Sequence, residues 1–311
     1  MRLKFNADTK LYFLIGDPME HSCTGFVNNG MFEAVRENAV LIPRTVKKEH
    51  LSEFLAAAKL MGANGIYLTM PHKSDIIEHL DECDEMSRAF HSANHIRIEP
   101  DGRLVGIGLD GMGMGETIQK SVSDLRSRKV LLLGAGSVAG AIAADLCVRG
   151  VMNFCIANRT VEKAEAIAKI LRRFFPDVAV ACGPLNDAFL ECKAKDADVA
   201  MQCTSLGILA PGYEDFSSLA FMEKLPKHCF AVDVLYPTSS FLAKAQELGL
   251  KNESGVMMTI HQQRGIMKFQ FGKDITDDVL LDAEENFRIA LTMRDVRMER
   301  LKKQRDEGGA Q

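Results

Sequence analysis

The sequence has no paired cysteines, no long apolar run and no excess of basic residues. Its eight cysteines form neither a CxxC pair nor a Cys/His cluster with zinc spacing, so we expect reduced structural thiols and no metal. No apolar stretch approaches the length of a membrane span, and no signal-peptide pattern opens the chain. The formal net charge of −4 favours neither nucleic acid nor an anionic membrane as a partner. We therefore expect a cytoplasmic globular enzyme, a monomer or a homodimer, that acts on a small molecule.

Strand-like and helix-like segments alternate along the chain. Before residue 110, apolar runs bounded by turn residues predict strands at 11–15, 41–46 and 65–69, and a helix at 74–90. From Lys129 on, continuous apolar strands separated by helices are typical of a parallel sheet that is buried on both faces. The pattern predicts an α/β fold of two domains, an N-terminal α/β substrate domain and a Rossmann-type doubly wound domain that binds a dinucleotide.

A glycine-rich turn opens the second domain. The residues Gly134, Ala135, Gly136, Ser137, Val138 and Ala139 match G-x-G-x-x-[GA] directly after a strand and at the start of a helix. In that context the pattern binds a dinucleotide pyrophosphate, because the helix N-terminus presents free N–H groups and a partial positive charge. The alternative is a purely structural turn between strand and helix.

The end of the next strand distinguishes NAD from NADP. It reads Asn158-Arg159-Thr160 and is followed by Lys163, without the acidic residue that would hold the ribose 2′-hydroxyl of NAD. Arg159 and Lys163 can contact a phosphate, and Asn158 and Thr160 can donate hydrogen bonds. The sequence therefore predicts NADP(H) as the cofactor, with a pair of solvated surface cations as the alternative.

Two charged residues are candidates for proton transfer. Lys73 follows a buried strand and the turn at Pro71, at the carboxyl edge of a sheet, where sites of α/β proteins form. Asp110 is the single acidic residue of a glycine-rich segment, 106–113, that indicates a crowded turn. Each residue alone would be a surface charge, but beside a dinucleotide domain they form a candidate acid–base pair.

Eight motifs give the chain a resemblance to the shikimate/quinate dehydrogenase family over nearly all of its length. They are G-x-P-x-x-H-S-x-S-P, present as GDPMEHSCTG at 16–25; N-V-T-x-P-x-K, present as YLTMPHK at 67–73; V-N-T, present as ANH at 93–95; G-x-N-T-D-G-x-G, present as GIGLDGMG at 106–113; N-R-T, intact at 158–160; N-A-T-S, present as QCTS at 202–205; D-x-x-Y-x-P, shortened to DVLYP at 233–237; and G-x-x-M-L-x-x-Q, present as GVMMTIHQ at 255–262.

The resemblance implies an NADP-dependent oxidoreductase that interconverts a hydroxyl and a ketone on a shikimate- or quinate-like alicyclic acid, as in aromatic amino acid biosynthesis. Lys73 and Asp110 match the family's catalytic pair. The residues that match substrate-binding groups are Ser22 and Thr24 for the carboxylate, Thr69, Asn94 and Gln262 for the ring hydroxyls, and Tyr236 near the carboxylate. The residues that match the cofactor site are the six of the glycine-rich turn, Asn158, Arg159, Thr160, Lys163, Thr204 and Ser205.

The expected domain bounds follow from the same motifs. Residues 1–110, completed by C-terminal helices at 256–311, form the substrate domain, and residues 111–255 form the dinucleotide domain. The chain departs from the family at Gly108-Leu109, which replace Asn-Thr before the catalytic Asp, and at His95, which replaces Thr. Because Leu109 removes a hydrogen-bonding group, two alternatives stay open: a dehydrogenase of a different small hydroxy acid, and a non-catalytic NADP-binding sensor.

Overall fold

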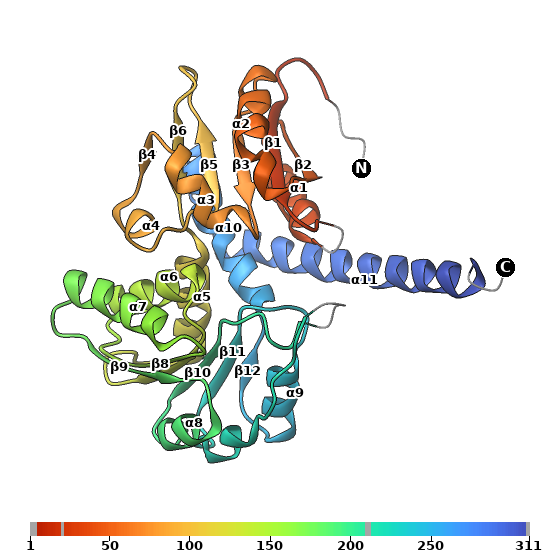
Figure 1. The fold of residues 1–311 in the computed structure, drawn as a ribbon. Coiled ribbons are helices and arrows are strands. Elements are labelled where there is room, and N and C mark those ends of the chain that lie inside the picture. The colour runs from red at the N-terminus through yellow and green to blue at the C-terminus, as the bar shows by residue number, and fades with distance from the viewer. Residues whose placement is uncertain (1–4, 20–21, 209–212, 309–311) are drawn as a thin grey trace. The chain divides into compact units, whose positions relative to one another are not determined.

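The computed structural model describes residues 5–19, 22–208 and 213–308. The chain forms two compact units, each with its own six-stranded sheet (Figure 1). Unit 1 comprises Met1–Glu82, His95–Val105 and Ile266–Gln311, and unit 2 comprises Cys83–Asn94 and Gly106–Gly265. The predicted α/β class is confirmed. In the described part of the chain, no helix has both the length and the apolar character that crossing a membrane requires.

The sheet of unit 1 runs in the order β2-β1-β3-β5-β6-β4. Its strands are β1 (Lys10–Gly16), β2 (Ala39–Thr45), β3 (Gly65–Leu68), β4 (Glu82–Cys83), β5 (His95–Ile98) and β6 (Leu104–Ile107). Strand β1 pairs in parallel with β2 and β3, and β5 pairs antiparallel with β3. The apolar run of β1 is buried from Tyr12 to Ile15, as expected for a strand covered on both faces. The parallel pairing brings the carboxyl ends of β1 and β3 to one edge of the sheet.

The helices of unit 1 are α1 (Thr24–Ala34), α2 (Leu51–Leu60), the short α3 (His72–Asp75), the end of α10 (Gly255–Phe271) and the long α11 (Asp277–Gly308). Helix α1 packs along α11 at the glycine Gly30. A Cβ atom there would stand 2.4 Å from the amide nitrogen of Asn286, so the missing side chain permits the close approach of the two helices.

The sheet of unit 2 runs in the order β12-β11-β10-β7-β8-β9, with all five neighbouring pairs parallel. Its strands are β7 (Lys129–Leu133), β8 (Asn153–Asn158), β9 (Ala179–Pro184), β10 (Val199–Gln202), β11 (Phe230–Asp233) and β12 (Asn252–Glu253). Counted from β7 as the first strand, this is the 3-2-1-4-5-6 order of the Rossmann fold, which reverses between β7 and β10. The predicted doubly wound sheet is confirmed.

Helices cover both faces of this sheet. They are α4 (Glu85–Ala89), α5 (Asp110–Ser121), α6 (Ser137–Val148), α7 (Val161–Phe174), α8 (Asp187–Ala194) and α9 (Ser240–Glu247), with the start of α10. Alternate residues of β7 point to opposite layers: Val130 and Leu132 join the core beside α6, whereas Leu131 and Leu133 join the core beside α8 and α9. The strand is therefore apolar at every central position.

Three stretches of unit 2 lie outside the expected bounds of the dinucleotide domain: residues 83–94, 106–110 and 256–265. Residues 83–94 bring Phe90 into the core of unit 2, and the start of α10 brings Met258 into the same core. The helix expected at 74–90 is wrong: Glu82–Cys83 form β4 at the edge of the first sheet, and α4 starts only after Asp84. The Asp84 carboxylate caps α4 by accepting a hydrogen bond of 2.9 Å from the Ser87 backbone N–H.

Candidate active site

The glycine-rich turn after β7 requires glycine at its first position. Gly134 has a φ of +105°, and a Cβ atom there would lie 2.9 Å from the carbonyl group of Cys203, which follows the neighbouring strand β10. The next residue, Ala135, donates its N–H to the side-chain oxygen of Asn158 at 3.1 Å. The turn is thus bound both to the end of β8 and to the segment after β10.

Gly136 leaves open space at the start of α6. A Cβ atom at this position would meet no atom within 4 Å, although the backbone there, at φ −80° and ψ 175°, suits any residue. Gly136 also brings no side chain to cap α6, so the N–H groups of the first turn can bind an anion. Packing does not explain this glycine, whereas the close approach of a pyrophosphate does. The turn therefore fits a dinucleotide.

The predicted residues at the end of β8 divide into two kinds. Asn158 is bound within the loop, since its side-chain nitrogen donates to the Thr160 carbonyl at 2.8 Å while its oxygen accepts from Ala135. Arg159 and Lys163 are exposed cations, as a phosphate contact requires. The Arg159 side chain, 73% exposed, forms an ion pair of 3.3 Å with Glu214. Glu214 was not predicted, because it lies 55 residues along the chain in a loop without a motif.

The segment after β10, which contains Thr204 and Ser205, contacts the glycine-rich turn at Gly134. The Thr204 hydroxyl accepts a hydrogen bond of 3.0 Å from the Leu206 N–H, and the buried side chain of Gln202 bonds both to the Thr204 N–H and, at 3.0 Å, to the Leu206 carbonyl. These bonds order the loop that contacts Gly134. Ser205 remains exposed there and can bind a ligand.

Asp110 is a buried carboxylate held by two amide groups. It is the first residue of α5 and only 4% exposed. One oxygen, Oδ1, accepts hydrogen bonds from the Asn94 side chain at 3.1 Å and from the Gln262 side chain at 3.0 Å. Asn94 is oriented in turn, because its own oxygen accepts from the Leu109 N–H at 2.8 Å. The structure thus joins three predicted site residues from three separate segments of unit 2.

Glycines in α5 let this helix pack closely against α6 and α10. At Gly111 a Cβ atom would stand 2.4 Å from the Ala141 carbonyl oxygen of α6, and at Gly113 it would stand 2.3 Å from the Met258 carbonyl oxygen of α10. Burial, followed by the negative charges of Asp233 and Asp110, raises the pKa of the Cys203 thiol. The carbonyl group of Cys203 also contacts Gly134 of the glycine-rich turn.

Leu109, the apolar departure beside Asp110, is a core residue. It is 4% exposed, and a Cβ atom at Gly265 of α10 would stand 2.7 Å from its side chain. The side chain therefore fills space against α10, while the backbone N–H of Leu109 still supports Asn94. The Asp110 cluster does not depend on a polar group at position 109.

Two further predicted residues, Thr69 and Lys73, follow β3 at the carboxyl edge of the sheet in unit 1. Lys73 lies in α3, after the turn that begins at Thr69. Thr69 also contacts the end of β1, where a Cβ atom at Gly16 would stand 2.3 Å from its methyl group. His72 anchors the turn from within the core: its Nε2 donates to the Val46 carbonyl at 2.7 Å, which gives this histidine a structural role. Lys73 therefore extends from a fixed turn.

Ser22 and Thr24 come from the segment that follows β1, at the start of α1, and both are partly exposed. Their neighbours Glu20 and His21, in the same motif, lie outside the described residues. Tyr236, in unit 2, is partly exposed just after β11 and precedes a cis-proline, Pro237. These three positions are accessible to a ligand in their own units.

Asp233 is a buried acid that the sequence analysis did not single out. It ends β11 and accepts hydrogen bonds from the Leu235 N–H, at 2.9 Å, and from the Ser239 hydroxyl. Ser239 also accepts a bond from the Leu242 N–H and so caps α9. Burial, the largest influence, raises the pKa of Asp233 to about 7. The shortened D-x-x-Y-x-P motif was the available signal for this residue.

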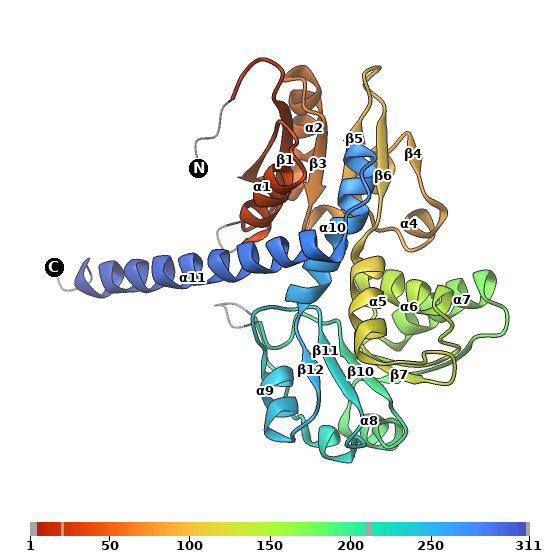
Figure 2. The ribbon, with the colours of Figure 1, turned by 180° about the vertical axis from the view of Figure 1, so that it is seen from behind.

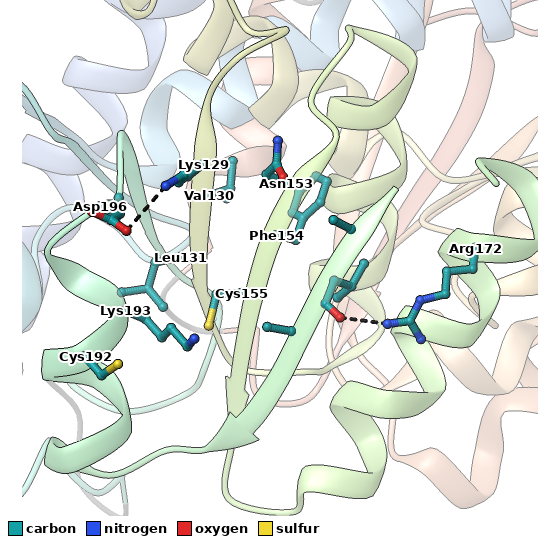
Figure 3. A pocket seen from close by; sticks show the side chains of 14 residues that line it. Lys129, Val130, Leu131, Asn153, Phe154, Cys155, Arg172, Cys192, Lys193 and Asp196 are labelled. Carbon is teal, nitrogen blue, oxygen red and sulfur yellow. Dashed lines mark hydrogen bonds and ion pairs between the residues drawn. The ribbon is translucent and has the colours of Figure 1, made fainter. Parts of the chain in front are cut away.

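A pocket of about 620 Å³ in unit 2 contains none of the predicted site residues (Figure 3). It is lined by residues of β7, β8, β9 and α8, including Cys155, Cys192 and Lys193. Lys129 closes one side through an ion pair of 3.3 Å with Asp196. Within residues 5–19, 22–208 and 213–308, no group of three or more His, Cys, Asp or Glu side chains is placed to hold a metal ion.

Two family models of known proteins match this chain, one in its N-terminal part and one in the part that contains the glycine-rich turn. The family model for the shikimate dehydrogenase substrate binding domain matches residues 14–96, and that for shikimate / quinate 5-dehydrogenase matches residues 116–239. The NADP(+) shikimate dehydrogenase of Methanocaldococcus jannaschii is 31% identical over 284 residues, which cover 89% of this chain and 97% of that protein.

Solved structures with a similar fold include members of the same family. A crystal structure of shikimate dehydrogenase in complex with NADP+ is 29% identical, with a TM-score of 0.78 over 91% of this chain and 97% of the other. The 5-ketofructose reductase of Gluconobacter sp. strain CHM43 is 25% identical, with a TM-score of 0.75 over 90% and 99% of the two chains. The glycine-rich turn, the Asp110 cluster and these matches over most of the chain agree, and the protein belongs to the shikimate dehydrogenase family.

Proposed function

We propose that this protein is an NADP(H)-dependent oxidoreductase that interconverts a hydroxyl group and a ketone on a shikimate- or quinate-like alicyclic acid. The observation that carries the proposal is the buried Asp110 carboxylate, held by Asn94 and Gln262 in the unit that also contains the glycine-rich turn. The family models and the NADP(+) shikimate dehydrogenases among the relatives support it. Residues 1–110 with 256–311 would bind substrate, and residues 111–255 would bind the cofactor.

The cofactor site would be formed by the turn at Gly134–Ala139 and by the cations after β8. Backbone N–H groups at the start of α6 would bind the pyrophosphate, and Arg159 and Lys163 would bind the 2′-phosphate of the adenosine ribose. Thr204 and Ser205 would line the same site. When bound, the nicotinamide supplies hydride acceptance or donation, while the protein fixes its orientation.

The proton step is assigned to Lys73 and Asp110. When the substrate is reduced, the Lys73 ammonium group would donate a proton to the carbonyl oxygen, and when it is oxidised, the amine would remove the hydroxyl proton. Asp110 would orient that ammonium group, since its own position is set by two amide donors. Asn94 and Gln262 would share their remaining hydrogen-bonding capacity with ring hydroxyls, and Ser22, Thr24 and Tyr236 would bind the carboxylate with hydroxyl groups.

Steady-state kinetics of Lys73→Ala, Asp110→Asn and the double variant test this assignment. Each single variant should lose about 10²–10⁴-fold in kcat while the Kd for NADP+ changes little, because a general acid or base contributes that much to the rate. If the two residues act as one pair, the double variant should lose little more than either single variant. Lys59→Ala, at an exposed position of α2, is the matched control. Independent, multiplicative losses would contradict the pair.

A second candidate is a reductase of a different small polyhydroxy compound. The observation that favours it is Leu109, which has no polar group to offer a ligand, together with the fold shared with a 5-ketofructose reductase. Absorbance of the reduced cofactor, followed with shikimate, quinate and a panel of other hydroxy acids and ketoses, separates the two. Turnover of shikimate or quinate supports the first function, and turnover only of other compounds supports the second. NADP+ binding without any turnover would exclude both.

A further inference from the structure

Helix α5, which begins at Asp110, is rich in glycine. Gly111, Gly113 and Gly115 occupy alternate positions in its first half. A glycine inside a helix costs roughly 1 kcal/mol relative to alanine, so these three residues need an explanation. Gly113 faces α10, where a Cβ atom would overlap the Met258 carbonyl group. Gly111 and Gly115 lie one turn apart, and both face α6.

The contacts of α5 with α6 advance along both helices together. A Cβ atom at Gly111 would overlap the Ala141 carbonyl group, and a Cβ atom at Gly115 would overlap the Asp145 carboxylate. A step of one turn along α5 is therefore matched by a step of one turn along α6. Both views show the two helices side by side (Figure 1, Figure 2). The helices run in the same direction, so both N-termini lie at the same end of the pair.

This shared direction sets the start of α5 beside the start of α6. The contacting residues are 30 positions apart in both pairs, which brings Asp110 level with Gly140. Gly140 lies in the first turn of α6, which begins at Ser137. The N–H groups of that turn are the ones that would bind the pyrophosphate. The register of α5 on α6 thus determines where the Asp110 carboxylate lies relative to the cofactor end of α6.

An ion pair on α6 packs against the backbone of α5 at Gly115. The Arg149 Nε donates to Oδ2 of Asp145 at 2.5 Å, and the two side chains are 19% and 20% exposed. The Arg149 guanidinium group also donates to the side-chain oxygen of Gln119 on α5. Burial raises the pKa of the Asp145 carboxyl group, and Arg149 opposes that shift. An ion pair one turn apart also stabilises its own helix, but that effect requires neither a glycine on the neighbouring helix nor a bond to Gln119.

We propose that Gly115, Asp145 and Arg149 are positioning residues for the proton step. The ion pair on α6 rests against the backbone at Gly115 and holds α5 in one register, which fixes the Asp110 carboxylate relative to the start of α6. This inference rests on the proposed function, in which Asp110 orients Lys73 and α6 binds the cofactor. Because reaction rates are sensitive to displacements of about 1 Å, a shift of α5 lowers kcat without removing a binding contact.

Steady-state kinetics of Gly115→Ala, Asp145→Ala and the double variant test the proposal. The methyl group of Gly115→Ala should displace α5 from α6, so kcat should fall about 10- to 100-fold while the Kd for NADP+ changes less than about threefold. Asp145→Ala should lower kcat only several-fold, since it loosens the contact without pushing the helices apart. Because it also makes room for the methyl group, the double variant should recover most of the kcat that Gly115→Ala loses. Losses that simply multiply would overturn the proposal.

Two further variants separate positioning from stability. Asp145→Asn keeps the shape of the side chain and should retain nearly the wild-type kcat. Leu190→Ala, in the core beside α8, should lower the melting temperature and leave kcat unchanged. A kcat that follows the melting temperature in every variant, Leu190→Ala included, would reduce the contact to a structural one. If Gly115→Ala does not fold, Asp145→Ala decides, and a wild-type kcat in that variant would equally refute the positioning role.

Crystal structures without cofactor distinguish failure of this inference from failure of the proposed function. In Gly115→Ala the separation between the Asp110 carboxylate and Gly136 should change by about 0.5 Å or more, and the double variant should restore it. A wild type that turns over neither shikimate, quinate nor any other hydroxy compound refutes the proposed function, and the separation then decides the inference alone. A separation that stays the same in Gly115→Ala would show that the contact does not position Asp110.

Discussion

Replacement of Arg159 by alanine should weaken binding of NADP+ and leave binding of NAD+ nearly unchanged. Arg159 follows β8, where its side chain is 73% exposed and pairs with Glu214 at 3.3 Å. The two nucleotides differ only in the 2′-phosphate. A difference in their response to Arg159→Ala therefore isolates the contact between the guanidinium group and that phosphate.

The expected magnitude follows from two opposing contributions. A hydrogen bond to a charged group contributes about 1.5–3 kcal/mol. About 0.2–1 kcal/mol is subtracted, because Arg159 must leave its exposed ion pair with Glu214 before it binds the phosphate. The net loss of about 0.5–2.8 kcal/mol corresponds to a roughly 2- to 100-fold rise in Kd. Glu214→Gln should act in the opposite direction and tighten NADP+ by roughly 1.5- to 5-fold, since it removes the competing carboxylate.

Isothermal titration calorimetry of Arg159→Ala, Glu214→Gln and the double variant, with both nucleotides, measures these changes. Most of the gain from Glu214→Gln should disappear when Arg159 is absent, because the competition is for the guanidinium group. Raising the salt concentration should reduce the preference for NADP+. Equal losses of NADP+ and NAD+ affinity in Arg159→Ala would refute the phosphate role and leave Arg159 as a surface cation.

Three further changes have expected outcomes. Gly136→Ala should leave the melting temperature unchanged, because the added Cβ meets no atom within 4 Å. The same variant should raise the Kd for NADP+ at least tenfold, because the Cβ would occupy the space of the pyrophosphate. An unchanged Kd would place the cofactor elsewhere. Gly140→Ala, whose Cβ would lie 2.3 Å from the Phe90 ring, should instead lose about 1–3 kcal/mol of stability, seen as a lower melting temperature. Asp233→Asn should gain stability relative to the wild type by about 3 kcal/mol between pH 5 and pH 8, measured by chemical unfolding. Burial raises the pKa of Asp233 from 3.8 to about 7. The stability that its protonated form provides is therefore complete below about pH 4 and is lost as pH rises through 7. A difference in unfolding free energy between the two proteins that stays constant with pH would contradict this.

The fold of unit 2 was predictable because its signals are local. The central strands β7, β10 and β11 are largely apolar runs, and the glycine-rich turn directly follows the first of them. The region 74–90 was not predictable in the same way. Its residue pattern favours a helix, but pairing of Glu82–Cys83 in the sheet and the capping bond of Asp84 divide it. Sheet pairing joins segments far apart in the chain, so no local pattern contains it.

The arrangement of the candidate site was likewise only partly predictable from local sequence patterns. Asn94, Asp110 and Gln262 could be named from their motifs, but motifs do not show that all three belong to one unit. All three lie close to places where the chain passes between units. Asn94 is the last residue of its segment in unit 2, Asp110 follows the start of the next segment at Gly106, and Gln262 precedes the end of that segment at Gly265. Glu214 has no motif at all. Its role emerges only from the loop that brings its carboxylate to Arg159.

His95 and Leu109, two of the residues that depart from the family motifs, lie in different units, and both side chains pack in the interior. His95 is 4% exposed in unit 1 and meets the ring of Tyr67 edge to face at 4.7 Å. Leu109 is buried against α10 in unit 2. Neither change removes a hydrogen bond from the Asp110 carboxylate. Burying a carboxylate is unfavourable unless donors compensate it, and here two amides from separate segments do so. Both departures thus leave the donors to the Asp110 carboxylate in place, as the proposed proton step requires.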